Sequence, residues 1–156
     1  SALGTTSHMV IDSTGAVTMP LQPAFLVQPA SAQNNIAINT AVTVVFGTEI
    51  FDQNADFASN TFTAPVTGKY QFSVALYLQG IDTGANYIEF ILVTSNRSYS
   101  VVLDPNFSAD LDYLPFTFSI LADMDASDTT IFTITQGGGN AQLDITAGKF
   151  SGFLAC

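Results

Sequence analysis

The chain has few of the residues from which enzyme sites, zinc sites and disulfide frameworks are built. Its 156 residues include one cysteine, one histidine and no tryptophan. Cys156 is the last residue, so an internal disulfide framework is excluded and stability must come from a core or an assembly. His8 lies in the N-terminal segment, far from Cys156 in sequence, which disfavours zinc and leaves a catalytic nucleophile without a base. We therefore predict that the chain is not an enzyme.

Positive charge is almost absent. Lys69, Arg97 and Lys149 are the only fixed cations, and the formal net charge is −10. Phosphate binding requires clustered lysine and arginine, so we expect no nucleic-acid partner. We interpret the acidic surplus mainly as a means of keeping an apolar protein soluble. Binding of a cation or of a basic partner remains an alternative.

Charged residues of both signs are scarce, and long apolar runs are missing. Charged residues make up 10% of the chain, against roughly 25% in an average soluble domain, while apolar residues make up 47%. Such a chain has difficulty covering its surface with polar groups, which favours burial of some apolar surface against other subunits. Its longest apolar stretches, such as 42–46 and 88–93, are only strand-length. Membrane insertion is therefore not expected.

The residues that are plentiful are those of β-structure. Short runs rich in Val, Ile, Thr, Phe and Tyr are broken by Gly, Asn, Asp or Pro, as in a sandwich or barrel. The clearest alternation follows the turn at 65–68, and it places one set on the core face and the other on an outer face. The core set is Tyr70, Phe72, Val74, Leu76 and Leu78, and the outer set is Lys69, Gln71, Ser73, Ala75 and Tyr77. No helix-length amphipathic pattern is present, so the predicted fold class is all-β.

The same reading predicts ten strands. These are Pro23–Gln28, Asn35–Ile38, Val42–Phe46, Thr61–Thr63, Gly68–Gln79, Asn86–Thr94, Ser98–Leu103, Tyr113–Leu121, Thr129–Gln136 and Gln142–Ala155. The short connection at 96–97 is typical of a hairpin turn. The connection at 137–140 is predicted to be another, because glycine and asparagine tolerate positive φ.

Two sequence motifs resemble the C1q-like family. The first is Phe46-x5-Asp52-x4-Phe57-x4-Phe62-x5-Gly68-x-Tyr70-x-Phe72, and the second is Phe150-Ser-Gly-Phe-Leu154 at the closing strand. The chain departs from the family pattern in two places. Four residues separate Phe57 from Phe62, where six are usual, and Val74 stands where the motif usually ends on an aromatic. The two matches together frame residues 21–156.

The resemblance implies a ten-stranded antiparallel jelly-roll sandwich of the C1q and tumour-necrosis-factor type, assembled as a homotrimer. Members of the family are non-catalytic and present loops to partners. Tyr77 and Phe153 are expected at the subunit interface. The full set expected in the core or the trimer contact is Phe46, Phe57, Phe62, Tyr70, Phe72, Tyr77, Phe150 and Phe153.

The first twenty residues follow a different pattern. Residues 9–20 contain a short strand, an Asp-Ser-Thr-Gly turn and a second short strand. This segment resembles those that close phage tail-fibre stems, and 19–25 resembles the junction that precedes a C1q-like head. The predicted organisation is thus a stem end at 1–20 and a head at 21–156. By this resemblance the protein is located in the virion, on a tail fibre or capsid appendage, and it is extracellular if the source is cellular.

Strand direction predicts which loops share an end of the sandwich. In an antiparallel fold every second loop lies at the same end, and the resemblance implies that both termini lie at the base. Loops 80–85, 104–112 and 137–141 are therefore expected to form an apical set, whereas 95–97 and 123–128 are expected at the base. Carboxylates, amides and tyrosines there suit a host-surface glycan or protein. The candidate ligand-binding residues are Asp82, Asn86, Tyr87, Asp104, Asn106, Asp110, Asp112, Tyr113, Gln136, Asn140 and Gln142. Ordinary solvated turns are the alternative interpretation.

Asp110 and Asp112 are also candidates for calcium, because three copies around an axis would repel one another unless spread apart or neutralised. No other cofactor is expected. The predicted function is host-receptor binding by a trimeric phage tail-fibre tip. A structural capsid decoration or trimerisation cap, or a secreted C1q-like recognition protein, remain alternatives.

Overall fold

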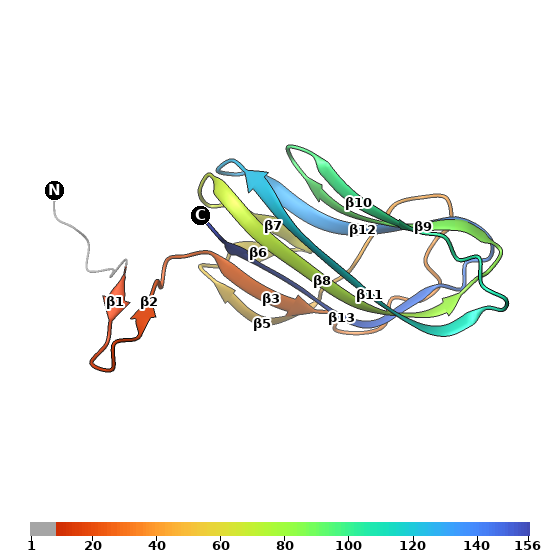
Figure 1. The fold of residues 1–156 in the computed structure, drawn as a ribbon, viewed down its shortest axis with the longest axis horizontal. Helices are drawn as coiled ribbons and strands as arrows, with labels where there is room; N and C mark the ends of the chain where they lie inside the picture. Colours follow the sequence, from red (N-terminus) through yellow and green to blue (C-terminus); the bar gives the residue numbers. More distant parts are fainter. Residues whose placement is uncertain (1–8) are drawn as a thin grey trace.

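Residues 9–156 are described by the computed structural model, and they form two stacked antiparallel sheets with a small hairpin beside them (Figure 1). The hairpin pairs β1 (Val10–Ile11) with β2 (Val17–Thr18). It stands apart from the sandwich, at the end where the C-terminus also lies (Figure 1). Residues 1–8 of the predicted stem segment, with His8, lie outside the described residues. The division into stem and head remains a prediction.

The first sheet has five strands, and its longest members are at or near one edge. In spatial order these are β11 (Leu111–Met124), β8 (Gly68–Ile81), β13 (Asp144–Leu154), β3 (Ala24–Gln28) and β5 (Thr48–Gln53).

The second sheet has six strands. Its main path is β10 (Ser98–Leu103), β9 (Ala85–Thr94), β12 (Thr129–Gly138), β7 (Thr61–Thr63) and β6 (Phe57–Ala58), and β4 (Val42–Thr43) also pairs with β12. The described residues contain no helix, and therefore none that could cross a membrane. The all-β prediction is confirmed.

Strand β8 shows the predicted alternation. Its inward side chains from Tyr70 to Leu78 are at most 2% exposed, whereas Tyr77 on the outward side is 60% exposed. The predicted core aromatics are all buried, and they are Phe46, Phe57, Phe62, Tyr70, Phe72 and Phe150. Phe153 lies on the outward side with Tyr77, 49% exposed. Hydrophobic burial on one face and exposure on the other is what a half-covered sheet produces.

Phenylalanine rings join the two sheets. The Phe25 ring of β3 lies 4.9 Å from Phe57 and 5.0 Å from Phe62, both in the six-stranded sheet, measured between ring centroids. Phe150 of β13 meets Phe25 edge-on at 5.0 Å. Stacked and edge-to-face rings at these distances attract one another beyond the area they bury. The cluster therefore fixes the spacing of the sheets at this end of the core.

The prediction of ten strands is wrong in detail, since eleven strands, β3 to β13, build the sandwich. Asn35–Ile38 is not a strand: Asn35 and Asn39 have φ of 54° and 58°, which ends extended structure, and Gln33 and Ile38 make only isolated bridges. Strand β4 ends at Thr43 rather than Phe46.

Strands β5 and β6 were not predicted. A register shift at Leu26/Val27 disrupts the pairing of β3 with β5, so Glu49, Ile50 and Phe51 are all exposed and period-two alternation is lost. A β-bulge of this kind places two residues opposite one. Residues 48–53 therefore lack the alternation from which a strand could have been predicted.

The connection at 137–140 is not a hairpin turn. Strand β12 pairs with β9 and belongs to the six-stranded sheet, whereas β13 pairs with β8 in the other sheet. The predicted positive φ is present at Gly138 (74°) and Gly139 (72°). These residues redirect the chain from one sheet to the other. The turn at 95–97 is a hairpin as predicted, closed by Thr94 N–H donating to the Arg97 carbonyl at 2.9 Å.

Replacing Phe150 by alanine should lower the free energy of unfolding by about 3–5 kcal/mol, because it removes a fully buried ring from the cluster that joins the sheets. Chemical denaturation measures the change. Val102→Ala, at a position 59% exposed, is the control and should change stability little. Equal losses in the two variants would contradict the proposed role of the cluster.

Candidate functional site at the apex

The three predicted apical loops meet at the end of the sandwich opposite the hairpin (Figure 1). The backbone N–H and hydroxyl of Thr83 both donate to Asp110 Oδ1 at 2.9 Å. Gln142 Nε2 donates to Asp110 Oδ2, also at 2.9 Å. At the base, Arg97 pairs with Asp123 at 2.7 Å across the two loops predicted there. The assignment of loops to ends from strand direction is confirmed.

Asp82 organises the apex. It is only 4% exposed, and its carboxylate accepts the N–H of Gly84 at 2.7 Å and the N–H of Asn140. One buried carboxylate thus links two loops, and the two backbone N–H groups give it the hydrogen-bond donors that a buried charge needs. Gly139 has a positive φ of 72°, and a side chain there would overlap the Asp82 carboxylate. Asp82 therefore supports the loops rather than facing a ligand.

Asp110 is a second support. The backbone N–H of Thr83, the Gln142 amide and the Thr83 hydroxyl lower the pKa of Asp110 below its usual value of 3.8. These three donors use most of the roughly four lone-pair positions of the carboxylate. Among residues 9–156 no group of three or more His, Cys, Asp or Glu side chains is placed to hold a metal ion. Calcium at Asp110 and Asp112 remains a prediction, with no ligand set around it.

Gln136 is fully buried, and it also holds the apical backbone. Its Nε2 donates to the carbonyls of Gly138 and Asn140 at 2.9 and 2.8 Å.

Sequence reasoning missed two apical residues, Asn39 and Thr83. Asn39 Oδ1 accepts the N–H of Gly138 at 2.9 Å. Asn39 was missed because a strand rather than a turn was expected at 35–38. The Asn-rich stretch 34–39 is the signal that could have revealed a turn there, since asparagine tolerates positive φ.

The two apical tyrosines lie on opposite faces of the sandwich. Tyr87 alternates with buried Ile88 on β9, and it lies over Gly137, where a side chain would overlap its ring. Tyr113 lies on the outward face of the five-stranded sheet and is 71% exposed. One flat site therefore cannot include both tyrosines of a single chain.

The predicted residues divide by exposure. Asp82 and Gln136 are buried, Gln142 is half-buried, and Asp110 is engaged by its neighbours. The exposed members, which are able to meet a ligand, are Asn86, Tyr87, Asp104, Asn106, Asp112, Tyr113 and Asn140.

A second candidate surface is the outward face of the five-stranded sheet. It is defined here as the outward positions of strands β11, β8, β13 and β3, without the edge strand β5. It exposes Tyr77, Leu121 and Phe153, with small polar residues such as Ser73 between them. Charged residues are few on this face: Lys149 lies near its centre, while Lys69 opposite Asp123 and Asp144 opposite Gln79 lie at its two ends. A face with so few charges on a strongly acidic chain is suited to burial.

Known structures share this architecture. The globular domain of zebrafish complement 1qA protein matches with a TM-score of 0.66 and 20% identity, covering 86% of this chain and 98% of that chain. Crystal structures of murine APRIL at pH 5.0 and pH 8.0 match with TM-scores of 0.58 and 0.60. They share 8% and 9% identity and each cover 85% of this chain and 98% of theirs. The chain has a C1q/TNF-like fold. No family model and no curated protein sequence matches it.

The likeness extends to the fold alone at these identities. The described C1q/TNF-like sandwich carries its polar apex at one end and its sparsely charged sheet face along one side. The two surfaces are therefore able to serve different contacts.

Replacing Asp82 by alanine should lower the free energy of unfolding by about 2 kcal/mol, because the N–H groups of Gly84 and Asn140 lose their buried acceptor. Amide hydrogen exchange at 84 and 140 should also accelerate. Asp112→Ala, at an exposed apical position, is the control and should leave both measurements near wild type. Unchanged exchange in Asp82→Ala would contradict the role given to this carboxylate.

Proposed function

We propose that the chain is a non-catalytic, homotrimeric recognition head that binds a host-surface receptor through its apex. The observation that carries the proposal is the outward face of the five-stranded sheet, which exposes Tyr77, Leu121 and Phe153 and has no carboxylate on strands β11, β8, β13 and β3 between their ends. The polar apex, held together by buried Asp82, forms the second surface.

The sheet face supports self-association. Tyr77, Leu121 and Phe153 are each about half exposed or more, at 60%, 52% and 49%. Burying apolar area is favourable by roughly 25 cal/mol per Å². The carboxylates Asp123 and Asp144 lie only at the ends of this face, so the net charge of −10 opposes close approach little at its centre. The stoichiometry of three follows from the resemblance to the C1q-like family.

The apex supports ligand binding. With the sheet faces of three copies around one axis, the three apices point the same way and are free to engage one surface together. Asn86 and Asn140 are exposed amides at the apex, and Tyr87 is an exposed aromatic ring there; amides suit hydrogen bonding to sugar hydroxyls, and an aromatic ring suits stacking on a sugar. Weak single sites on three linked copies gain avidity without a new contact. We therefore take the ligand class to be cell-surface carbohydrate.

The virion is the proposed location, on a phage tail fibre or other appendage. The support is the resemblance of residues 9–25 to the segments that join such stems to their heads. The β1–β2 hairpin lies at the base, away from the apex, as a stem junction requires (Figure 1). Sequencing the complete gene tests this placement: a long repetitive stem upstream is expected, whereas a signal peptide and collagen repeats would contradict it.

Placing a charge on the sheet face should break the trimer. Ser73 is exposed at the centre of that face, so Ser73→Asp would bury an unpaired carboxylate in each protomer. Light scattering should give about three times 16.5 kDa for wild type and about 16.5 kDa for the variant. The matched control is Ser100→Asp, on the outward face of the other sheet, which should stay trimeric. A monomeric wild type would overturn the assembly, and a trimeric Ser73→Asp would overturn its location.

Changing the apex should abolish ligand binding without changing the assembly. On an array of cell-surface glycans, Tyr87→Ala and Asn140→Ala should each lose most of the wild-type signal. Alanine at 140 keeps the backbone N–H that Asp82 accepts, so the loops stay in place. Asn96→Ala, an exposed amide at the base, is the matched control and should bind like wild type. Undiminished binding by both apical variants would refute the apex as the site.

A further inference from the structure

The β1–β2 hairpin exposes more apolar surface than an isolated element tolerates. Seventeen large apolar side chains are exposed among residues 9–156, and six of them fall within 9–21. They are Met9, Val10, Ile11, Val17, Met19 and Leu21, between 38% and 63% exposed. A two-stranded hairpin of this length is marginal in water without a cover.

The hairpin nevertheless has a well-specified turn. Asp12 Oδ1 accepts the N–H and the hydroxyl of Thr14, at 2.8 and 2.7 Å, and the N–H of Ala16 at 3.0 Å. Gly15 supplies the positive φ of 88° that the turn needs. The sequence thus builds this hairpin locally, and both of its strands are exposed in the structure of residues 9–156.

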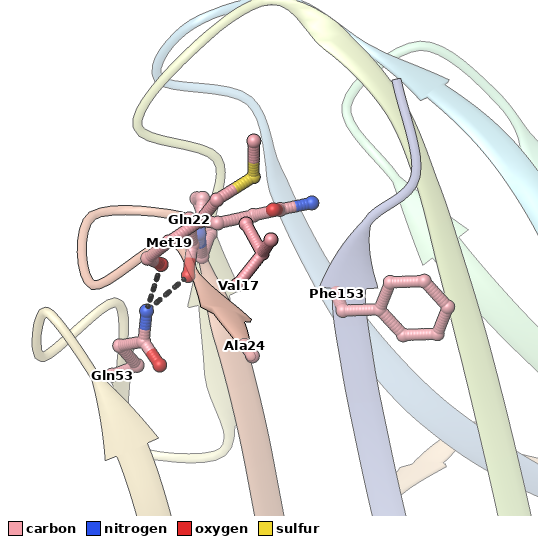
Figure 2. A pocket seen from close by; sticks show the side chains of 7 residues that line it. Val17, Met19, Gln22, Ala24, Gln53 and Phe153 are labelled. Atoms are coloured by element: carbon pink, nitrogen blue, oxygen red, sulfur yellow. Dashed lines mark hydrogen bonds between the residues drawn. The ribbon is translucent and has the colours of Figure 1, made fainter. Parts of the chain in front are cut away.

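Hydrogen bonds also fix where the hairpin joins the head. Gln53 Nε2 donates to the carbonyls of Met19 and Gln22 at 2.9 and 2.8 Å (Figure 2). Gln22 Nε2 in turn donates to the carbonyl of Leu154 at 2.6 Å. A groove of about 370 Å³ lies at this junction, and Val17, Met19 and Phe153 are among the residues that line it (Figure 2).

The groove continues the outward face of the five-stranded sheet through Phe153. Phe153 belongs to that face and pairs with Gln71 and Ala24 across the sheet. On the hairpin, Ile11 is directly opposite Val17, so both side chains project to the groove side. Thr18 and Val10 form the other side. The hairpin and groove carry a single charge, Asp12, whose carboxylate is already bonded within the turn.

We propose that the hairpin is a second self-association element, and that a neighbouring copy of this chain fills the groove at the base. The inference rests on the proposed trimer. Assembly through the sheet face would bring three bases to one end, so each hairpin would enter beside its equivalents. The exposed side chains of Phe153, Val17 and Ile11 then become buried between protomers. The partner is a second copy of this chain, because each copy in the assembly carries the same apolar hairpin at the same end.

Introducing a carboxylate on one side of the hairpin tests the proposal in the full chain. Val17→Asp should raise the concentration at which the trimer dissociates by about tenfold or more, the factor expected from losing a buried aliphatic contact. Thr18→Asp, the adjacent position on the opposite side, should leave it unchanged. Light scattering over a dilution series gives both values, and circular dichroism checks that the head remains folded. Equal dissociation of the two variants overturns the proposal while leaving the trimer intact.

Thiol accessibility provides a second, independent measurement. In a Cys156→Ser background, maleimide labelling of Val17→Cys in the trimer should be about tenfold slower than that of Thr18→Cys, although both positions are exposed in a single chain. Equal labelling rates in a trimeric protein would show that the groove is open, and would overturn the proposal alone. A monomeric background protein would overturn both the trimer and this inference.

Discussion

The contact on which the rest of this structure depends is the packing of phenylalanine rings between the two sheets. Phe25 and Phe150 come from the five-stranded sheet, and Phe57 and Phe62 come from the other. These rings hold the sheets face to face without a disulfide, since the one cysteine is free and exposed at the end of the chain. Once the two layers are fixed, strand direction decides which loops share an end. The packing of the core therefore determines which loops meet at the apex.

The scarcity of charge has a structural counterpart. The core is built from apolar side chains, and the outward face of the five-stranded sheet carries Lys149 near its centre and Lys69, Asp123 and Asp144 only at its ends, so most carboxylates lie on other parts of the surface. Some of them support structure: Asp82 holds two apical loops, Asp110 links a third, and Asp12 forms the hairpin turn. The acidic surplus therefore reflects several local tasks as well as solubility.

Sequence reasoning worked best where periodicity is regular. The alternation along β8 and the aromatic motif predicted the buried side chains, and the count of strand reversals placed the apical and basal loops at the correct ends. It did not predict β5, because a bulge removes the alternation there. It also expected a hairpin at 137–140, where the chain crosses between sheets. Turn residues show that the chain bends and leave open which strand it joins next.

The sequence by itself determined the all-β class, the core face of each regular strand and the end at which each later loop lies. Those properties depend on a period of two and on chain reversal, which are local. Only the tertiary structure decided that Asp82 is a buried support and that Tyr87 and Tyr113 lie on opposite faces. It also decided that Asn39 belongs to the apex and that a groove separates the hairpin from the head. The physical reason is that these features arise from contacts between distant segments, such as Asp82 with Asn140, 58 residues apart, and no local pattern specifies such pairs.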